Sequence, residues 1–194
     1  MANQNAIAVV GEAIVALLRA SLDAADLSGV PVQQASAADL TRGFSSRTIT
    51  VHLYRVGIHS VTRNRAPRTE ASGRTFRPSM PLELSFLITA WGADVPEQQR
   101  LLGLALRSLH DQARIPAAAL NAATGDHDVF GTNEEVELIP SPVSQTEMVA
   151  IWEAAKANMQ PSMPYVVRVI YLDSLVVQEQ APPVVTRGVD VVQR

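Results

Sequence analysis

Four histidines are the first residues whose chemistry would suit an enzyme or a metal protein. They are His52, His59, His110 and His127, and their spacing matches no metal-ligand motif. His52 falls in the middle of a predicted strand and His110 late in a predicted helix. Isolated histidines at such positions are most often surface groups or hydrogen-bonded core groups, so none is predicted to be catalytic.

A short acidic run resembles part of a calcium-binding loop. Asp126, Asp128, Gly131 and Glu137 match positions one, three, six and twelve of such a loop. Phe130 stands at position five, where an oxygen ligand is required, and Glu137 falls in a predicted strand instead of a helix. We therefore predict a solvated acidic turn, with no metal and no cofactor.

Other catalytic signatures are absent from the sequence. It has no phosphate-binding loop ending in Lys-Ser/Thr, no G-x-S-x-G motif and no H-E-x-x-H motif. The absence of cysteine excludes a thiol nucleophile and a Cys-ligated metal. A non-enzymatic role is predicted, and an unrecognised small hydrolase is kept as an alternative.

Residues 62–78 concentrate positive charge. The segment has one acid, Glu70, and its arginines are Arg63, Arg65, Arg68, Arg74 and Arg77. Arginine is enriched in protein interfaces because its planar guanidinium pairs with carboxylates through two hydrogen bonds. Two interpretations of this segment stay open: a solvated loop, or an interface with acidic residues of a neighbouring copy. A nucleic-acid-associated role for the loop 63–77 is a further alternative, disfavoured by a formal net charge of −3 and by Phe76 being the one aromatic residue in the loop.

Periodicity and capping residues predict the helices around these segments. Apolar residues at three- and four-residue steps predict a helix over 5–23. Asp94 with Glu97, and Ser144 with Glu147, have the spacing of capping boxes and predict two further helix starts. The predicted buried residues of the helix after Asp94 are Leu102, Ala105, Leu106 and Leu109.

Alternating or β-branched apolar residues predict the strands. The strand segments are 48–56, 58–61, 81–91, 134–139 and 165–172. Gly57 is predicted to form a turn or a bulge, and residues 28–37 a loop. This order predicts an α+β fold, a mixed and mostly antiparallel sheet packed with about three helices.

The composition changes after residue 178. Pro182 and Pro183 interrupt regular structure, and the residues that follow are rich in valine: Val184, Val185, Val189, Val191 and Val192. A disordered tail is typically poor in β-branched apolar residues, so a strand donated to the sheet of another subunit is favoured over a frayed terminus. We expect a single domain over 1–177 and an extended arm over 178–194.

The N-terminal residues do not resemble a targeting signal. Residues 1–6 carry no Lys or Arg, and charged residues interrupt the apolar stretch that follows. No segment approaches the roughly 18 uncharged apolar residues that a membrane helix needs. We therefore expect the chain to fold in the cytoplasm.

Short motifs taken in order resemble one known family. They are Leu53-Tyr54-Arg55-Val56 with Arg63-Asn64, Pro81-Leu82 before Leu87-Ile88-Thr89-Ala90-Trp91-Gly92, Leu101-Leu102-Gly103 with Leu109-His110-Asp111, then Trp152, and Pro161-Ser162-Met163-Pro164-Tyr165. From Ile7 to about Leu172 the chain is similar to the N-terminal domain family of tube-terminating cap proteins from extracellular contractile injection systems, of the virulence-cassette and antifeeding-prophage type.

The resemblance implies a phage tail-terminator-like fold and a structural role. Such proteins form a six-fold ring on the last layer of the inner tube, stop its growth and contact the last sheath layer. The implied partners are further copies of the chain, the tube protein and the sheath protein, with no nucleic acid, membrane or small-molecule substrate. Cytoplasmic assembly would be followed by incorporation into a released injection particle.

A six-fold ring requires a heterologous interface, in which one patch meets a different patch on the next copy. The candidate contact residues are Arg63, Asn64, Arg65, Arg68, Arg74 and Arg77 in the loop, and Val184, Val185, Val189 and Val191 in the arm.

Overall fold

The described strands form one six-stranded sheet and one small hairpin. The computed structural model describes residues 2–62, 65–70, 72–125 and 128–178. The sheet has the order β1-β2-β5-β8-β7-β6, and β3 pairs with β4. The strands are β1 (Val32–Gln34), β2 (Thr48–Ile58), β3 (Arg68–Thr69), β4 (Thr75–Phe76), β5 (Met80–Trp91), β6 (Arg114–Pro116), β7 (Glu135–Pro140) and β8 (Ser162–Leu172).

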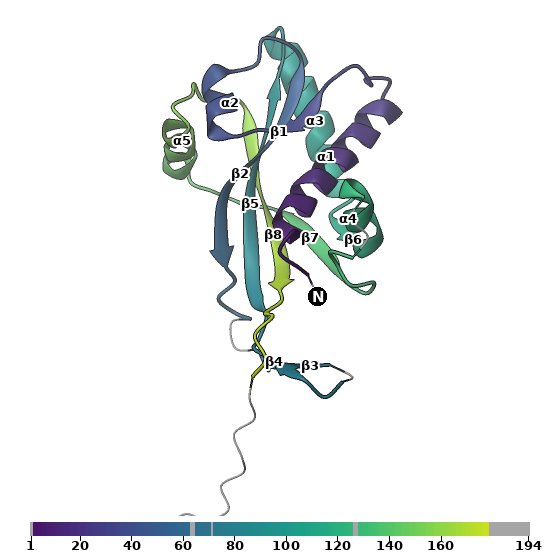
Figure 1. The fold of residues 1–194 in the computed structure, drawn as a ribbon. Helices are drawn as coiled ribbons and strands as arrows, with labels where there is room; N and C mark the ends of the chain where they lie inside the picture. The colour runs from purple at the N-terminus through teal and green to yellow at the C-terminus, as the bar shows by residue number, and fades with distance from the viewer. Residues whose placement is uncertain (1, 63–64, 71, 126–127, 179–194) are drawn as a thin grey trace, which may run out of the picture.

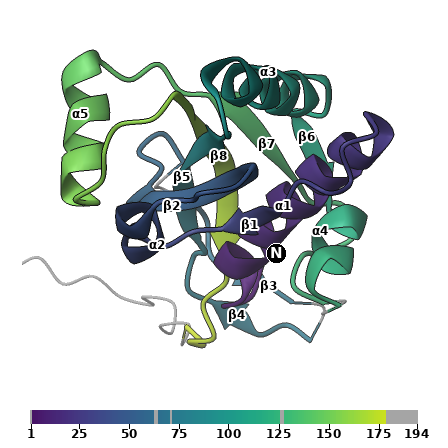
Figure 2. The ribbon, with the colours of Figure 1, turned by 90° about the horizontal axis from the view of Figure 1, so that it is seen from above.

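Helices lie on both faces of this sheet (Figures 1 and 2). They are α1 (Ala6–Ala24), α2 (Ala37–Arg42), α3 (Val95–Asp111), α4 (Ala117–Thr124) and α5 (Gln145–Ala154). Helices α1, α3 and α4 pack on one face, whereas α2 and α5 lie on the other face near one end. Within the sheet β1 runs parallel to β2 and the other neighbours are antiparallel, which confirms the predicted α+β class with a mixed, mostly antiparallel sheet.

The main core lies between the sheet and helices α1, α3 and α4. Alternate residues of β5, Leu84, Phe86 and Ile88, are fully buried there against α1 residues such as Ile14 and Val10. Full burial of each such side chain contributes about 1.5–3 kcal/mol relative to exposure. The alternation predicted for residues 81–91 therefore gives the central strand of the core.

A second, smaller core holds α2 and α5 against the opposite face. Leu87 and Trp91 of β5 contact this cluster, together with Leu40 of α2 and Trp152 of α5. The rings of Trp91 and Trp152 meet edge to face with centroids 6.2 Å apart. Farther along this face Arg168 of β8 is exposed and donates a hydrogen bond of 2.9 Å to Glu83. Helices α2 and α5 therefore cover one end of this face, and the part around Arg168 is exposed.

Several local predictions differ from the structure. The register shift of β2 falls between Leu53 and Arg55, not at Gly57, which continues the strand opposite Glu83. Strand β1 forms within residues 28–37, which were predicted to be a loop. In α3, Ala105 and Leu109 are buried as predicted, and Leu101 and Ser108 are buried as well. Leu102 and Leu106 are only partly buried, at the border of the main core.

The two predicted capping boxes differ in their hydrogen bonds. Ser144 and Glu147 form the reciprocal box. Asp94 accepts from the Glu97 amide at 2.8 Å, but the Glu97 carboxylate accepts from Ala93 instead of Asp94. Helices α2 and α4 are additional to the predicted three.

The hairpin β3–β4 extends beyond the end of the main sheet (Figure 1). The chain that leaves β8 runs beside it, because the Arg77 amide donates to the Val176 carbonyl at 3.0 Å and the Gln178 amide to the Thr75 carbonyl at 2.7 Å. We call the end of the molecule formed by the hairpin and residues 173–178 the hairpin end. Among the described helices, none combines the length and the apolar character needed to cross a bilayer.

Candidate partner-binding surfaces

Arg68 of the hairpin has three partners within its own chain. Its guanidinium lies 3.2 Å from a Glu70 oxygen and 3.5 Å from an Asp173 oxygen. It also lies 4.6 Å from the ring centroid of Phe76, which is buried. Arg68 therefore joins β3, β4 and the segment after β8, and its charge is balanced locally.

The other arginines of the segment that the structure describes are more exposed than Arg68. Arg65 stacks on Tyr171 with its guanidinium carbon 3.8 Å from the ring centroid, and Arg74 lies 3.3 Å from Glu70. Arg77 is exposed on the hairpin end. The candidates Arg63, Asn64, Val184, Val185, Val189 and Val191 lie outside the described residues. The structure thus gathers Arg65, Arg68, Arg74 and Arg77 at one end.

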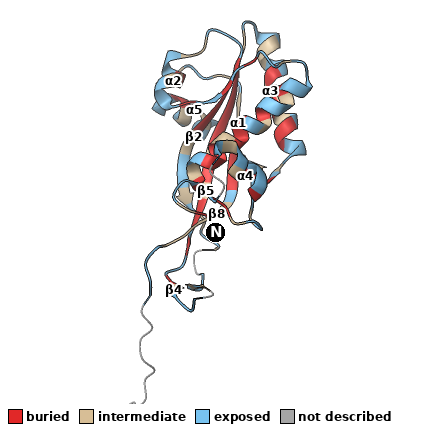
Figure 3. Cartoon of the chain, turned by 45° about the vertical axis from the view of Figure 1, so that its right-hand side comes forward, coloured by how far each residue is buried: buried red, intermediate tan, exposed pale blue. Residues whose placement is uncertain are grey.

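A group of exposed apolar residues lies at the same end of the sheet, where much of the chain near β4 is exposed (Figure 3). Its residues, here called the hairpin-end patch, are Val56, Ile58, Val61, Met80, Leu175, Val176 and Val177. Val61 and Leu175 have exposed fractions of 85% and 82%. Exposed apolar residues that gather in this way mark interaction surfaces. This patch was not predicted from the sequence, although the Leu-Val-Val run after β8 is an apolar signal.

The acidic run next to β7 is held by its own chain. Arg114 lies 3.2 Å from a Glu135 oxygen and 3.9 Å from a Glu137 oxygen, in largely exposed pairs. Phe130 is buried, and its backbone exchanges two hydrogen bonds of 2.9 Å with the Asn121 side chain. Asp126 and His127 lie outside the described residues, and the described part of the chain holds no cluster of three His, Cys, Asp or Glu that suits a metal.

The other histidines that the structure describes make local contacts. The Nδ1 atom of buried His52 lies 2.7 Å from the Ala35 carbonyl oxygen. The Nδ1 atom of His59 lies 2.9 Å from the Thr62 hydroxyl. His110 is exposed in the last turn of α3. The structure does not bring these three side chains to one site.

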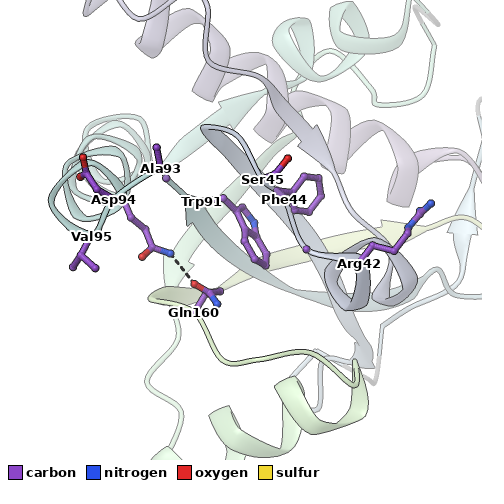
Figure 4. A pocket seen from close by; sticks show the side chains of 11 residues that line it. Arg42, Phe44, Ser45, Trp91, Ala93, Asp94, Val95 and Gln160 are labelled. Carbon is purple, nitrogen blue, oxygen red and sulfur yellow. Dashed lines mark hydrogen bonds between the residues drawn. The ribbon is translucent and has the colours of Figure 1, made fainter.

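A pocket of about 510 Å³ lies at the opposite end of the sheet (Figure 4). Phe44 and Trp91 form part of its wall, with ring centroids 5.1 Å apart. Its polar side chains bond within the chain, since Gln98 donates to Gln160 at 2.9 Å and Asp94 caps α3. Hydrogen bonds within the chain therefore already engage the Gln98 and Asp94 side chains of this pocket.

A second groove, of about 440 Å³, runs between β2 and α5. It is mainly apolar, and its wall includes Leu53 and Tyr54 of β2 with Ile151 and Ala154 of α5. The groove borders the part of β2 that continues past β1.

The pKa shifts in the chain follow from caps and burial. Hydrogen bonds from the Ser36 side chain and backbone lower the pKa of Asp39, and the backbone and side chain of Ser144 lower that of Glu147. Burial raises the pKa of Tyr165. These groups lie in helix caps or in the core, so the shifts reflect structure and not a catalytic acid or base.

Residues 9–186 match the model of the Pvc16 N-terminal domain family. The chain belongs to this family. The match confirms the resemblance inferred from the sequence motifs. No match was found among curated proteins.

Two solved structures show the fold of this Pvc16 N-terminal domain protein in larger chains. One is a PVC sheath/tube terminator in the extended state, with a TM-score of 0.63 and 18% identity, covering 100% of this chain and 65% of that one. The other is the anti-feeding prophage tube-terminating cap, with a TM-score of 0.56 and 19% identity, covering 94% of this chain and 60% of that one. The chain therefore spans less than two thirds of either chain.

Proposed function

We propose that the chain is a structural subunit that closes the end of the inner tube in a phage-tail-like contractile injection system. The observation that carries this proposal is the similarity of the whole fold to a sheath/tube terminator and to a tube-terminating cap. Membership of the Pvc16 N-terminal domain family supports it independently. Closing a tube requires shape and contacts and no reaction.

The proposed assembly is a six-fold ring that also contacts the last sheath layer. The hairpin end supplies suitable contact chemistry, because exposed Arg65 and Arg77 lie near the hairpin-end patch. Arginine beside apolar surface is typical of interfaces between proteins. Exposed Glu135 and Glu137 are candidate partners on the next copy, since their pairs with Arg114 are largely exposed and contribute about 0–1 kcal/mol each.

We propose a single cap domain over residues 1–177 and an arm over 178–194 that joins another subunit. Candidate arm contacts are Val184, Val185, Val189 and Val191, and candidate loop contacts are Arg63, Asn64, Arg65, Arg68, Arg74 and Arg77. In this scheme the ring assembles in the cytoplasm and becomes part of the released particle.

Tube growth gives the direct test. Inner tube protein is polymerised with and without the chain, and tube lengths and ends are recorded by electron microscopy. We expect shorter tubes whose ends carry a cap of six copies, and co-sedimentation of the chain with the tubes. Unchanged lengths together with no co-sedimentation would reject the proposal.

A further inference from the structure

Strand β2 has an open edge at the hairpin end of the sheet. Strand β1 pairs with β2 only from Ile49 to Val51, while β5 pairs with the other side of β2 as far as Ile58. On the β1 side, no described strand pairs with β2 after Val51. An open edge of this kind offers backbone donors and acceptors to another chain.

The register identifies which backbone groups face outward. The His59 amide donates to the Pro81 carbonyl at 3.0 Å, so His59 turns its backbone groups toward β5. Backbone direction alternates along an antiparallel pair, so Gly57 and Arg55 also face β5. Val56 and Ile58 therefore present their amides and carbonyls on the open side.

The side chains at this edge divide between the two faces. Val56 and Ile58 pair with the core residues Leu84 and Leu82, yet 48% and 56% of their own surface is exposed. Arg55 is exposed on the opposite face and lies near enough to Glu147 of α5 to contribute to lowering the pKa of that carboxyl. An incoming strand would meet apolar surface on one face and a positive charge on the other.

We propose that this edge, residues 53–58 of β2, receives residues 189–192 from the C-terminal arm of a second copy. The inference rests on the proposed ring and names where the arm binds. Residues 189–192 have the sequence Val189-Asp190-Val191-Val192, and side chains alternate between faces in a strand. Such a strand places Val189 and Val191 beside Val56 and Ile58, and directs the Asp190 carboxylate, together with Val192, to the face that carries Arg55. Main-chain hydrogen bonds supply affinity, and the alternating side chains supply register.

The path of the described chain favours a second copy over the chain's own edge. Residues 176–178 pair with the strand β4 region and lead away from the body of the molecule (Figure 1). They continue from β8, and β5 separates β8 from β2. An extended chain covers about 3.3 Å per residue, so from Gln178 to Val189 it spans about 35 Å, which allows contact with a neighbouring subunit. The choice of a second copy therefore rests on the direction in which residues 176–178 leave the sheet.

Cysteine cross-linking tests this placement, because the chain has no cysteine of its own. Chains with Val56→Cys are mixed with chains carrying Val191→Cys, assembled on tubes and gently oxidised. Opposed side chains on adjacent strands lie close enough for a disulfide, so we expect a covalent dimer on a non-reducing gel. The matched control pairs Val191→Cys with Val95→Cys, since Val95 is also apolar and exposed but begins α3 at the opposite end of the sheet. It should give no dimer above background.

The results separate this inference from the proposed function. Co-sedimentation with tubes is measured on the same samples. If the chain caps tubes but Val191→Cys forms no dimer with Val56→Cys or Ile58→Cys, the proposed binding site is wrong and the proposed cap function stands. The proposed binding site is also overturned if a chain carrying both Val56→Cys and Val191→Cys forms its disulfide within one monomer, or if it cross-links only to sheath protein. A chain that does not bind tubes rejects the cap and the inference together.

Discussion

At the scale of single residues, the hairpin arginines differ in what they do. Arg68 has 24% of its side chain exposed and binds Glu70, Asp173 and Phe76, whereas Arg77 is exposed. Arg68→Ala is expected to weaken the hairpin by about 1 kcal/mol, because partly exposed ion pairs and cation–π contacts each contribute less than about that amount. Faster amide exchange at residues 68–76, with little change in global stability, would show it. An equal effect of Arg77→Ala would contradict this assignment.

Glu147 gives a prediction about pH. Hydrogen bonds from the Ser144 backbone and hydroxyl lower its pKa from the ordinary 4.5. A depressed folded-state pKa stabilises the fold fully above the unfolded value, and this contribution is lost as the pH falls through the folded value. An NMR titration should place the Glu147 pKa below 4.5, and Ser144→Ala should move it upward. The same pKa in both proteins would show that the cap does not form in solution.

At the scale of elements, α5 depends on one anchor. Trp152 is 1% exposed in the second core, and its Nε1 has no hydrogen-bond partner among the described residues. Trp152→Ala should cost about 3–5 kcal/mol, as is typical for buried aromatic residues. Trp152→Phe should cost much less, because it also removes an unpaired buried N–H that is unfavourable by about 1–3 kcal/mol. Urea unfolding compares the two variants, and equal losses would contradict the argument.

The elements that the sequence predicted well have strong local signals. The alternation in β5 and the Ser144–Glu147 box each identify their element without knowledge of distant residues. Strand β1 has three residues and depends on pairing with β2, so its own sequence carries little information. Helices α2 and α4 have six and eight residues, which is too short for a repeat of apolar residues to identify them from the sequence. Which arginines are balanced internally follows only from tertiary contacts, as Asp173 beside Arg68 shows.

The C-terminal arm, residues 178–194, is expected to contribute to assembly and little to the stability of its own domain. Residues 176–178 pair with the hairpin, so removal of residues after Ala181 leaves these bonds intact. We expect this truncation to leave the melting temperature nearly unchanged but to impair assembly on tubes. Removal of residues after Leu172 also deletes Asp173 and the hairpin pairing, and should additionally speed amide exchange in the hairpin. A large loss of melting temperature in the shorter truncation would mean that the arm packs on its own domain.

At the scale of the whole molecule, contact chemistry is concentrated at the hairpin end. Both cores lie within the sheet and its helices, whereas the hairpin-end patch stays exposed. Arg65 and Arg77 lie near it, and neither bonds to the core clusters. Because such a surface adds little to the stability of its own domain, its residues can be determined by contacts with a partner. Charge reversal there should therefore separate assembly from folding.

This expectation is tested by measuring mass in solution and on tubes. Light scattering of the wild-type chain at neutral pH and moderate salt is expected to give six times the monomer mass, or a monomer that becomes six-fold on tube ends.

Arg65→Glu with Arg77→Glu should leave a folded monomer that fails to assemble, because like charges would then oppose Glu135 and Glu137 of the next copy. Replacing Arg63, Arg65 and Arg68 together with Glu should also prevent assembly, but would disturb the hairpin through Arg68. Arg107→Glu, an exposed change on α3, is the matched control and should assemble normally. A hexamer that persists in the Arg65/Arg77 variant would move the interface away from the hairpin end.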